Sequence, residues 1–380
     1  MRKCEEIDNP DANVAVRLDL DQDSEEDLRS SNHGAHSTTL NSLLDNNVNI
    51  LVLTHLSGDD SISGVADYLE EFTGHSVQLV EEGDLSASLM DVNNDEILLY
   101  ENLYDMEGEI IDSDEDISSV QFDSFVDEVS SNIDAYVNDS FSLSHMELPS
   151  TTELSKEVPS YAGRFLDSEV DFLSSVRSSS EDIKFFFSGT NISRDLDSIE
   201  NILARTNDYQ VVTSGLISLV FLEADGYDLG VETRELIEDE GSEQSIDVAY
   251  EILTQYGERV HIPKDVASYS GGSKSEYALS ATPISEPIED IGSETAEMYE
   301  GLFNDSDLVV STGVTSKNQV EMDTYERTLQ ADYSVVAGSE TISFCDEVGM
   351  TGFTHTTRNP NPLIQFLIGD ELPALQSLLP

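Results

Sequence analysis

The feature that most constrains the fold is a regular alternation of short apolar runs with helix-like segments along the chain. Apolar runs typical of β-strands cover 14–21, 48–55, 77–80, 97–102, 133–138, 183–187, 209–212, 260–265, 308–313 and 334–337. Helix-like segments lie between them, at 40–44, 62–72, 193–205 and 216–222. Strands that alternate with helices form βαβ units, which build a parallel sheet covered by helices on both faces. The sequence therefore predicts an α/β fold.

The length of the chain favours two such domains. Its 380 residues, 38% of them hydrophobic, suffice for two ordinary cores. A polar loop over 147–159 leads to a helix predicted over 161–175, and a serine-rich acidic run follows at 178–182. We expect the domain boundary within 165–178, on this helix.

The charge of the chain is extreme and indicates its setting. The sequence holds 78 acidic and 17 basic residues, which gives a formal net charge of -61. In dilute salt such self-repulsion opposes a compact state, whereas at about 1 M salt the Debye length falls to about 3 Å and the repulsion is screened. A halophilic cytoplasm is the setting that this charge favours. The apolar content argues against the alternative, an acidic disordered chain.

Composition also excludes several partners and cofactors. Without a basic patch or a basic helix, neither nucleic acid nor an anionic membrane surface is expected as a partner. No apolar run is long enough for a membrane span and the first residues lack a signal peptide's apolar region, so we expect a cytoplasmic protein. Cys4 and Cys345 are far apart and lack metal-ligand spacing, which argues against a disulfide framework and a zinc site.

One long interval of the sequence, from residue 30 to residue 155, contains no lysine or arginine. Phosphate groups in proteins are usually held by arginines, by helix N-termini, or by both. Within this interval the side chains that can still become cationic are His33, His36, His55, His75 and His145. Each alone is more often a structural histidine. Together they are the only cationic lining that the interval could supply.

Two motifs in the first half resemble the phosphoglycerate kinase family. The strand Val14-Ala-Val-Arg-Leu-Asp-Leu-Asp21 is similar to the family's Val-Arg-Val-Asp-Phe-Asn, and Val137-Asn-Asp-Ser-Phe141 to its Val-Asn-Asp-Ala-Phe. The resemblance implies catalytic roles for Arg17, Asp19 and His55, and substrate-binding positions at Asp21, Asn32, His36, Asn138 and Asp139. Family arginines are replaced at Asn32, Gly58 and Met146. Without the family, Asp19 and Asp21 are also consistent with the solvated face of a strand.

The second half carries the most specific match. Asp290-Ile-Gly-Ser-Glu-Thr295 is closely similar to the family's Asp-Ile-Gly-Pro-Glu-Thr, and Ser334-Val-Val-Ala-Gly-Ser-Glu-Thr341 resembles its Val-Val-Gly-Gly-Gly-Asp-Thr, a strand that leads to a phosphate-facing helix N-terminus. The resemblance implies that Mg-ADP or Mg-ATP is held by Asn191, Gly313, Glu340 and Thr341, with Glu340 as the magnesium ligand. Asn191 replaces a phosphate-binding lysine, and 359–361 replaces three glycines. Without the family, Glu340 is also consistent with an acid that favours a helix dipole.

The resemblance spans about residues 14–377 in the family's order and implies the family's fold. That fold has two doubly wound parallel-sheet, Rossmann-like domains joined by a helix, here 1–165 for phosphoglycerate and 166–355 for nucleotide, with 356–380 returning to the first domain. It also implies a monomer that transfers a phosphoryl group between 1,3-bisphosphoglycerate and ADP in glycolysis. Because basic residues are replaced, we expect this activity to be weakened or lost. The alternatives are a catalytically inactive paralogue that binds a protein or a ligand, and a fold retained under drift.

Overall fold

The structure is a computed structural model that describes residues 1–21, 34–56, 62–81, 83–92, 96–105, 123–241, 243–270, 273–281, 283–284, 286–314 and 319–379. The chain divides into two compact units. Unit 1 comprises Met1–Ser174 and Gly369–Pro380, and unit 2 comprises Ser175–Ile368. The limit falls on α7 (Arg164–Ser179). We predicted that residues 356–380 return to the first domain, but residues 356–368 belong to unit 2.

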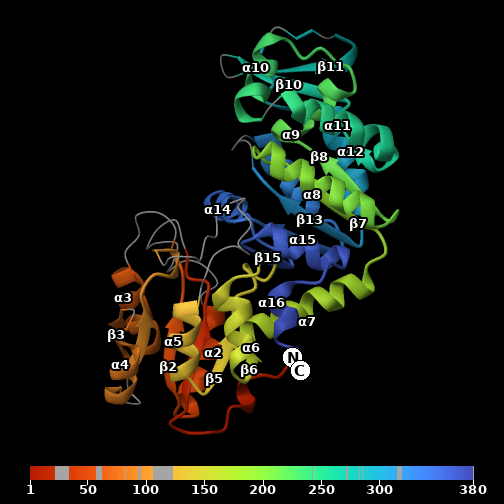
Figure 1. The fold of residues 1–380 in the computed structure, drawn as a ribbon. Helices are drawn as coiled ribbons and strands as arrows, with labels where there is room; N and C mark the ends of the chain where they lie inside the picture. Colours follow the sequence, from red (N-terminus) through yellow and green to blue (C-terminus); the bar gives the residue numbers. More distant parts are fainter. Residues whose placement is uncertain are drawn as a thin grey trace. The chain divides into compact units, whose positions relative to one another are not determined.

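Unit 1 is built on a sheet of parallel strands in the order β3-β4-β2-β1-β5-β6 (Figure 1). Its strands are β1 (Asn13–Arg17), β2 (Asn49–Leu53), β3 (Ser76–Val80), β4 (Glu96–Tyr100), β5 (Ala135–Asn138) and β6 (Ser160–Ala162). Its helices are η1 (Cys4–Glu6), α2 (Gly34–Asp45), α3 (Ile62–Thr73), α4 (Leu85–Asp91), η2 (Leu103–Asp105), α5 (Asp123–Asn132), η4 (Pro149–Glu153), α6 (Leu154–Glu157) and α16 (Pro373–Ser377). α2 packs with α3, and α4 packs with α5, so the helices form two separate layers.

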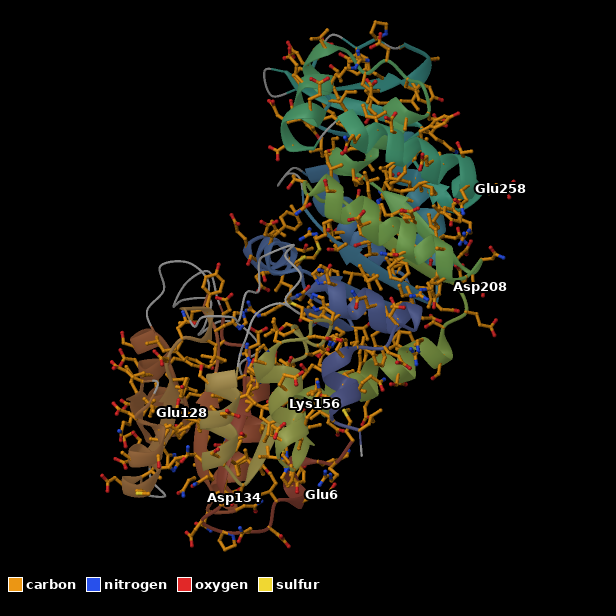
Figure 2. The ribbon with its side chains drawn as sticks, in the orientation of Figure 1. Glu6, Glu128, Asp134, Lys156, Asp208 and Glu258 are labelled. Atoms are coloured by element: carbon orange, nitrogen blue, oxygen red, sulfur yellow. The ribbon has the colours of Figure 1, made fainter. Side chains whose placement is uncertain are left out.

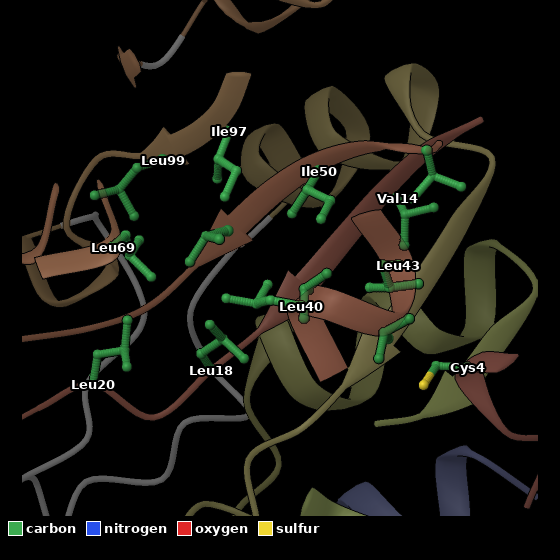
Figure 3. Packing of buried hydrophobic residues seen from close by; sticks show 14 of the residues in the cluster. Cys4, Val14, Leu18, Leu20, Leu40, Leu43, Ile50, Leu69, Ile97 and Leu99 are labelled. Atoms are coloured by element: carbon green, nitrogen blue, oxygen red, sulfur yellow. The ribbon is translucent and has the colours of Figure 1, made fainter. Parts of the chain in front are cut away.

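The apolar runs of the sequence form the core of unit 1. Every residue of β2 after Asn49 is buried, as expected for a strand whose two faces are both covered by helices. Figure 3 shows Val14 and Ile50, from paired strands, together with Leu40 and Leu43 of α2 in one cluster. This packing fixes where β1 and β2 end, and therefore which polar residues follow them.

Unit 2 contains a second parallel sheet, in the order β15-β14-β13-β7-β8-β9. Its strands are β7 (Ile183–Phe187), β8 (Tyr209–Thr213), β9 (Val260–His261), β13 (Leu308–Thr312), β14 (Tyr333–Ala337) and β15 (His355–Thr357). Its helices are α8 (Ile192–Arg205), α9 (Gly215–Ala224), α10 (Val231–Glu240), α11 (Glu243–Tyr256), η5 (Gly257–Arg259), η6 (Leu279–Ala281), α12 (Ser293–Asn304), α13 (Gln319–Thr328), α14 (Ser339–Glu347) and α15 (Pro360–Ile368). The two parallel sheets confirm the predicted fold class.

Two local predictions are wrong. The run 260–265 is not one strand: β9 ends at His261, and Pro263 lacks the N–H that a ladder needs. The chain then starts β10 (Asp265–Ser270), which pairs antiparallel with β11 (Ser273–Ala278) and with β12 (Asp290–Ile291) in a small separate sheet. The helix predicted from residue 161 begins at Arg164, because β6 pairs with β5 just before it.

Acidic side chains stand on the surface of both units. Figure 2 labels Glu6 and Asp134 of unit 1 and Asp208 and Glu258 of unit 2, all of which are exposed. Among the described helices none is both long enough and apolar enough to cross a membrane.

Candidate functional site

The polar residues predicted for the first half meet where the strand order of unit 1 reverses. From β1 the chain passes to β2 on one side of it, whereas β5 pairs on the other side. In doubly wound folds such a reversal, at the carboxyl ends of the strands, is where ligands bind. Arg17 ends β1 and Asn138 ends β5, and these two residues are paired in register. We call this place the unit 1 switch point.

Arg17 is buried at the unit 1 switch point and forms hydrogen bonds with several residues there. The residue is 0% exposed. Its guanidinium donates hydrogen bonds to Ser150 Oγ (3.0 Å), to the backbone oxygen of Leu18 (2.6 Å) and to His55 Nδ1 (2.8 Å). Because Nδ1 of His55 accepts, the neutral imidazole carries its proton on Nε2, which lies 3.5 Å from Asp21 Oδ2. Arg17 thus links the ends of β1 and β2.

Near neutral pH Asp19 is ionised, whereas His55 is uncharged. Burial by itself would raise the pKa of Asp19, but the net shift is downward. Burial, and then the charge of Arg17, lower the pKa of His55 to about 4. His55 is therefore neutral at pH 7. With His55 neutral, the groups that lower the pKa of Asp19 include the Ser142 hydroxyl, which donates to Asp19 Oδ2, and then the charge of Arg17.

His36 and Asp139 connect α2, β5 and α7. His36 Nδ1 lies 3.0 Å from Asp139 Oδ2. The other oxygen of Asp139 accepts hydrogen bonds from the backbone N–H groups of Phe165 and Leu166, at 3.0 and 3.2 Å. A carboxylate placed against the N-terminus of a helix satisfies otherwise unpaired donors and favours the helix dipole. Asp139 is therefore a structural cap as well as a predicted substrate-binding residue.

Two of the five histidines of the interval 30–155, His55 and His145, do not supply a cationic lining near pH 7. Burial lowers the pKa of His145 to about 4, so His145, like His55, is neutral near pH 7. His75 lies at the end of α3, with Nδ1 3.0 Å from the backbone oxygen of Thr73. Within unit 1 two buried side-chain nitrogens have no hydrogen-bond partner among the described residues, Nδ2 of the fully buried Asn138 and Nδ1 of His145. The predicted positions Asn32, His33 and Gly58 lie outside the described residues.

Basic side chains elsewhere in unit 1 are held in other contacts. Lys3 pairs with Asp167, Lys156 with Glu153, and Arg164 with Glu5, while Arg2 stacks over Tyr161. Within the part of unit 1 that the structure describes, Arg17 is thus the one basic residue at the switch point. Two carboxylates accompany it, Asp19, on which its charge acts, and Asp21, which lies beside His55, and together they leave a local excess of negative charge.

Unit 2 has a second switch point, between β7 and β13, which continue in opposite directions across the sheet. The loops that follow these strands approach very closely. A Cβ added to Gly313 would lie 2.4 Å from the backbone of Gly189, so neither loop could carry a side chain there without moving. The Gly313 N–H donates to Thr341 Oγ1 (2.9 Å), which ties the β13 loop to the start of α14.

Three of the four predicted nucleotide residues of unit 2, Asn191, Glu340 and Thr341, occupy helix starts. Asn191 is the N-cap of α8, and its side chain accepts the N–H of Arg194 at 3.2 Å. Glu340 is exposed in the first turn of α14, beside the buried Thr341. Mg²⁺ is often bound by one or two carboxylates together with substrate phosphates, a role that a single exposed carboxylate such as Glu340 fits. No cluster of three or more metal-ligating side chains occurs within the described ranges.

Two family-like segments prove to have structural roles. Pro360 is the first residue of α15, and Asn359 Oδ1 accepts the N–H of Asn361 at 3.0 Å, so 359–361 begins a helix. The Asp290–Thr295 motif forms β12 and the start of α12. Its Thr295 and Glu294 N–H groups donate to the carboxylate of Asp265, at 2.8 and 3.1 Å.

Sequence reasoning missed three residues at the switch points. The Ser142 hydroxyl donates to Asp19, and Ser150 Oγ accepts from Arg17. In each pair the two residues are more than a hundred positions apart in the sequence. Asp195, in the first turn of α8, carries a buried carboxylate. An acidic residue in the first turn of the helix predicted over 193–205 was the one available signal, and it is weak because first-turn acids are common.

Comparison with known proteins agrees with this geometry. Two doubly wound units, each with polar residues at a switch point, define a class of two-domain α/β proteins that bind ligands at strand ends. The family model for phosphoglycerate kinase matches residues 4–370, and the chain belongs to this family. The phosphoglycerate kinase of Methanothermus fervidus is 26% identical over 98% of this chain and 96% of its own length. That of Natronomonas pharaonis is 24% identical over 100% and 99%.

A solved structure supports the same fold. The crystal structure of phosphoglycerate kinase from Pyrococcus horikoshii matches with a TM-score of 0.82 and 23% identity, over 100% of this chain and 98% of that chain. The phosphoglycerate kinase structure from Coxiella burnetii gives 0.76 and 20% identity, over 98% of this chain and 97% of that chain.

Proposed function

We propose that this protein is a phosphoglycerate kinase homologue whose phosphoryl transfer is strongly weakened or lost. The observation that carries the proposal is the charge balance at the unit 1 switch point, where Asp19 and Asp21 accompany a fully buried Arg17. A phosphoglycerate brings a carboxylate and a phosphate, which need charge-assisted hydrogen bonds from cations or N–H groups. Removing one group that stabilises charge in a transition state typically lowers the rate by about 10²- to 10³-fold.

In this proposal the ligands are those of the family. Arg17, Asp19 and His55 position the reacting glycerate, and Asp21, His36, Asn138 and Asp139 surround it. Asn191, Gly313, Glu340 and Thr341 hold the nucleotide, with Glu340 toward Mg²⁺, which when bound neutralises phosphate charge. Because Asn191 replaces a lysine, Mg-ADP should bind at least about tenfold more weakly than to a competent family member. Calorimetry in high KCl that gives micromolar affinity would contradict this.

The setting belongs to the same proposal. A net charge of -61 suits a cytoplasm of molar salt, in which surface repulsion is screened. Assays of activity and binding therefore belong in high KCl, where a loss of function is not confused with unfolding.

A coupled assay in about 2–4 M KCl tests the transfer reaction under screening conditions. We expect no measurable turnover from folded protein, while the Natronomonas pharaonis relative serves as the active control. Turnover of about one per second, an ordinary enzyme rate, that disappears in Asp19→Ala would refute the proposal.

A charge variant tests the reason for the loss. Asp21→Asn removes one negative charge next to His55 at nearly constant shape, and should raise the affinity for 3-phosphoglycerate. The matched control is Asp91→Asn, the same change at the exposed end of α4, which should have no effect. Equal responses of the two variants would show that local charge at the unit 1 switch point is not the cause.

An inactive ligand-binding paralogue is the second candidate, favoured by the unpartnered nitrogens of Asn138 and His145. Neutral donors and acceptors suit a ligand with little charge better than a phosphate ester. Under this alternative, uncharged glycerol-like polyols should stabilise the protein in thermal unfolding more than 3-phosphoglycerate does. Stabilisation by 3-phosphoglycerate alone would exclude it.

A further inference from the structure

Unit 2 buries a carboxylate oxygen that makes no hydrogen bond with the described part of the chain. Asp195 is 3% exposed, and its Oδ2 has no partner there. Its Oδ1 lies 3.6 Å from Nη2 of the neighbouring Arg194. A buried polar atom without a partner costs stability, so it calls for an explanation such as a ligand or a proton.

The position of this oxygen points to the unit 2 switch point. A Cβ added to Gly189 would lie 2.5 Å from Asp195 Oδ2 and 3.5 Å from the Gly313 Cα. Asp195 Oδ2 therefore adjoins the place where the β7 and β13 loops meet, at the start of α8. A helix N-terminus there favours anions, because its backbone N–H groups point outward, whereas an ionised carboxylate at the same place opposes them.

The surroundings leave the charge of Asp195 nearly uncompensated. Burial raises its pKa to about 6, and Arg194 opposes that rise only in part. The elements packed against α8 are β8, α9, α11 and α15. Among the side chains that the structure describes, their titratable groups are Tyr209 of β8, Glu223 of α9, and Asp247, Tyr250, Glu251 and Tyr256 of α11, while α15 has none. None of these groups is among the causes of the shift.

We infer that Asp195 determines the ligand specificity of unit 2: ionised, it disfavours a polyphosphate at the switch point, and protonated, it admits one. The inference rests on the proposed nucleotide role of this unit. Binding of a nucleoside diphosphate is then coupled to the uptake of one proton by Asp195, and the affinity falls as the pH rises. The ligand class that escapes this control is one without a phosphate next to α8.

The experiment is calorimetry of Mg-ADP binding in molar KCl with wild type, Asp195→Asn and Asp197→Asn. Asp197 is exposed on the same helix, so its variant removes the same charge without touching the switch point. Between about pH 6 and 7.5 wild-type affinity should fall by about fifteenfold, because a required acid with a pKa of about 6 is about half protonated at pH 6 and only about 3% protonated at pH 7.5. The protonation of ADP itself also changes with pH, but it affects binding to all three proteins equally and cancels when their pH slopes are compared.

Asp195→Asn should bind Mg-ADP more tightly than wild type at about pH 7.5 and lose the added pH dependence, while Asp197→Asn should behave like wild type. Equal affinities and equal pH slopes for wild type and Asp195→Asn would overturn the inference and leave the nucleotide role intact. Absence of binding by all three proteins at every pH would overturn both.

Folding is checked by circular dichroism before each titration. Asp195→Ser is a second neutral variant for the case that the amide does not fit, and it should give the same flattened pH profile as Asp195→Asn. A Ser variant that keeps the wild-type profile would also contradict the inference.

Discussion

Replacing Gly292 by alanine should destabilise unit 2 far more than an ordinary glycine substitution. Gly292 precedes α12, and its φ of -84° is allowed for any residue, so the effect is steric. A Cβ there would lie 2.1 Å from Asp265 Oδ2. The carboxylate would have to move by more than 1 Å, since such contacts are normally above about 3.4 Å. That movement breaks its hydrogen bonds to Glu294 N, Thr295 N and Thr295 Oγ1.

The magnitude follows from these bonds. Loss of a helix cap costs about 0.5–2 kcal/mol, and each buried group left without a partner costs about 1–3 kcal/mol. We therefore expect Gly292→Ala to lower the free energy of unfolding by about 2–5 kcal/mol, with partial relaxation of the carboxylate setting the lower value.

The matched control lies on the same helix. Gly301 has no atom within 4 Å of an added Cβ, so Gly301→Ala should stabilise α12 by about 0.5–1 kcal/mol, the usual helix preference for alanine. Urea unfolding in molar KCl, followed by circular dichroism because the chain has no tryptophan, measures both variants. A Gly292→Ala protein within about 0.5 kcal/mol of wild type, the scatter of ordinary surface substitutions, would refute the steric argument.

Two further predictions concern salt and pH. In about 50 mM salt, where charges are weakly screened, the protein should unfold or expand, and it should recover its structure in molar KCl; full native circular dichroism at low salt would contradict this. Because the pKa of His145 is lowered from 6.5 to about 4, its contribution to stability is complete above about pH 6.5 and is lost as the pH falls toward 4, by up to about 3 kcal/mol. His145→Gln should remove that part of the acid sensitivity in unfolding measured at several pH values, and an unchanged pH profile would exclude His145 as its source.

The elements that the sequence predicted are those with a dense apolar signal. β7 (Ile183–Phe187) and β13 (Leu308–Thr312) are central strands that are buried along their length. Their near-continuous apolar runs are typical of parallel strands covered on both faces. β11 (Ser273–Ala278) was missed because its side chains are small, charged or polar, and β6 (Ser160–Ala162) because three residues carry no periodicity. Edge and antiparallel strands are specified by their pairing partners, which the local sequence does not contain.

The candidate site was predictable in outline but not in its charge states. Carboxyl ends of parallel strands lie along one edge of a sheet, so Arg17 and Asn138 could be expected to meet. The serines that hold Arg17 and Asp19 could not, since a serine carries no signal of a distant partner. The neutral state of His55 depends on burial and on the nearby guanidinium, and neither is visible before the chain is folded.

Unit 1 combines residues 1–174 with residues 369–380, and this has a consequence for its folding during synthesis on the ribosome. The segment 140–153, which supplies Ser142 and Ser150, is itself held by the last helix: Ala374 N–H donates to the Ser144 backbone oxygen at 3.2 Å, and Ser377 Oγ to that of Thr151 at 3.4 Å. All of unit 2 is translated before residues 369–379 exist. A nascent chain therefore presents an unfinished first unit throughout the synthesis of the second, a period in which exposed apolar surface invites chaperones or aggregation. The segment that carries Ser150, the acceptor for Arg17, therefore gains these contacts only after residues 369–379 have been synthesised.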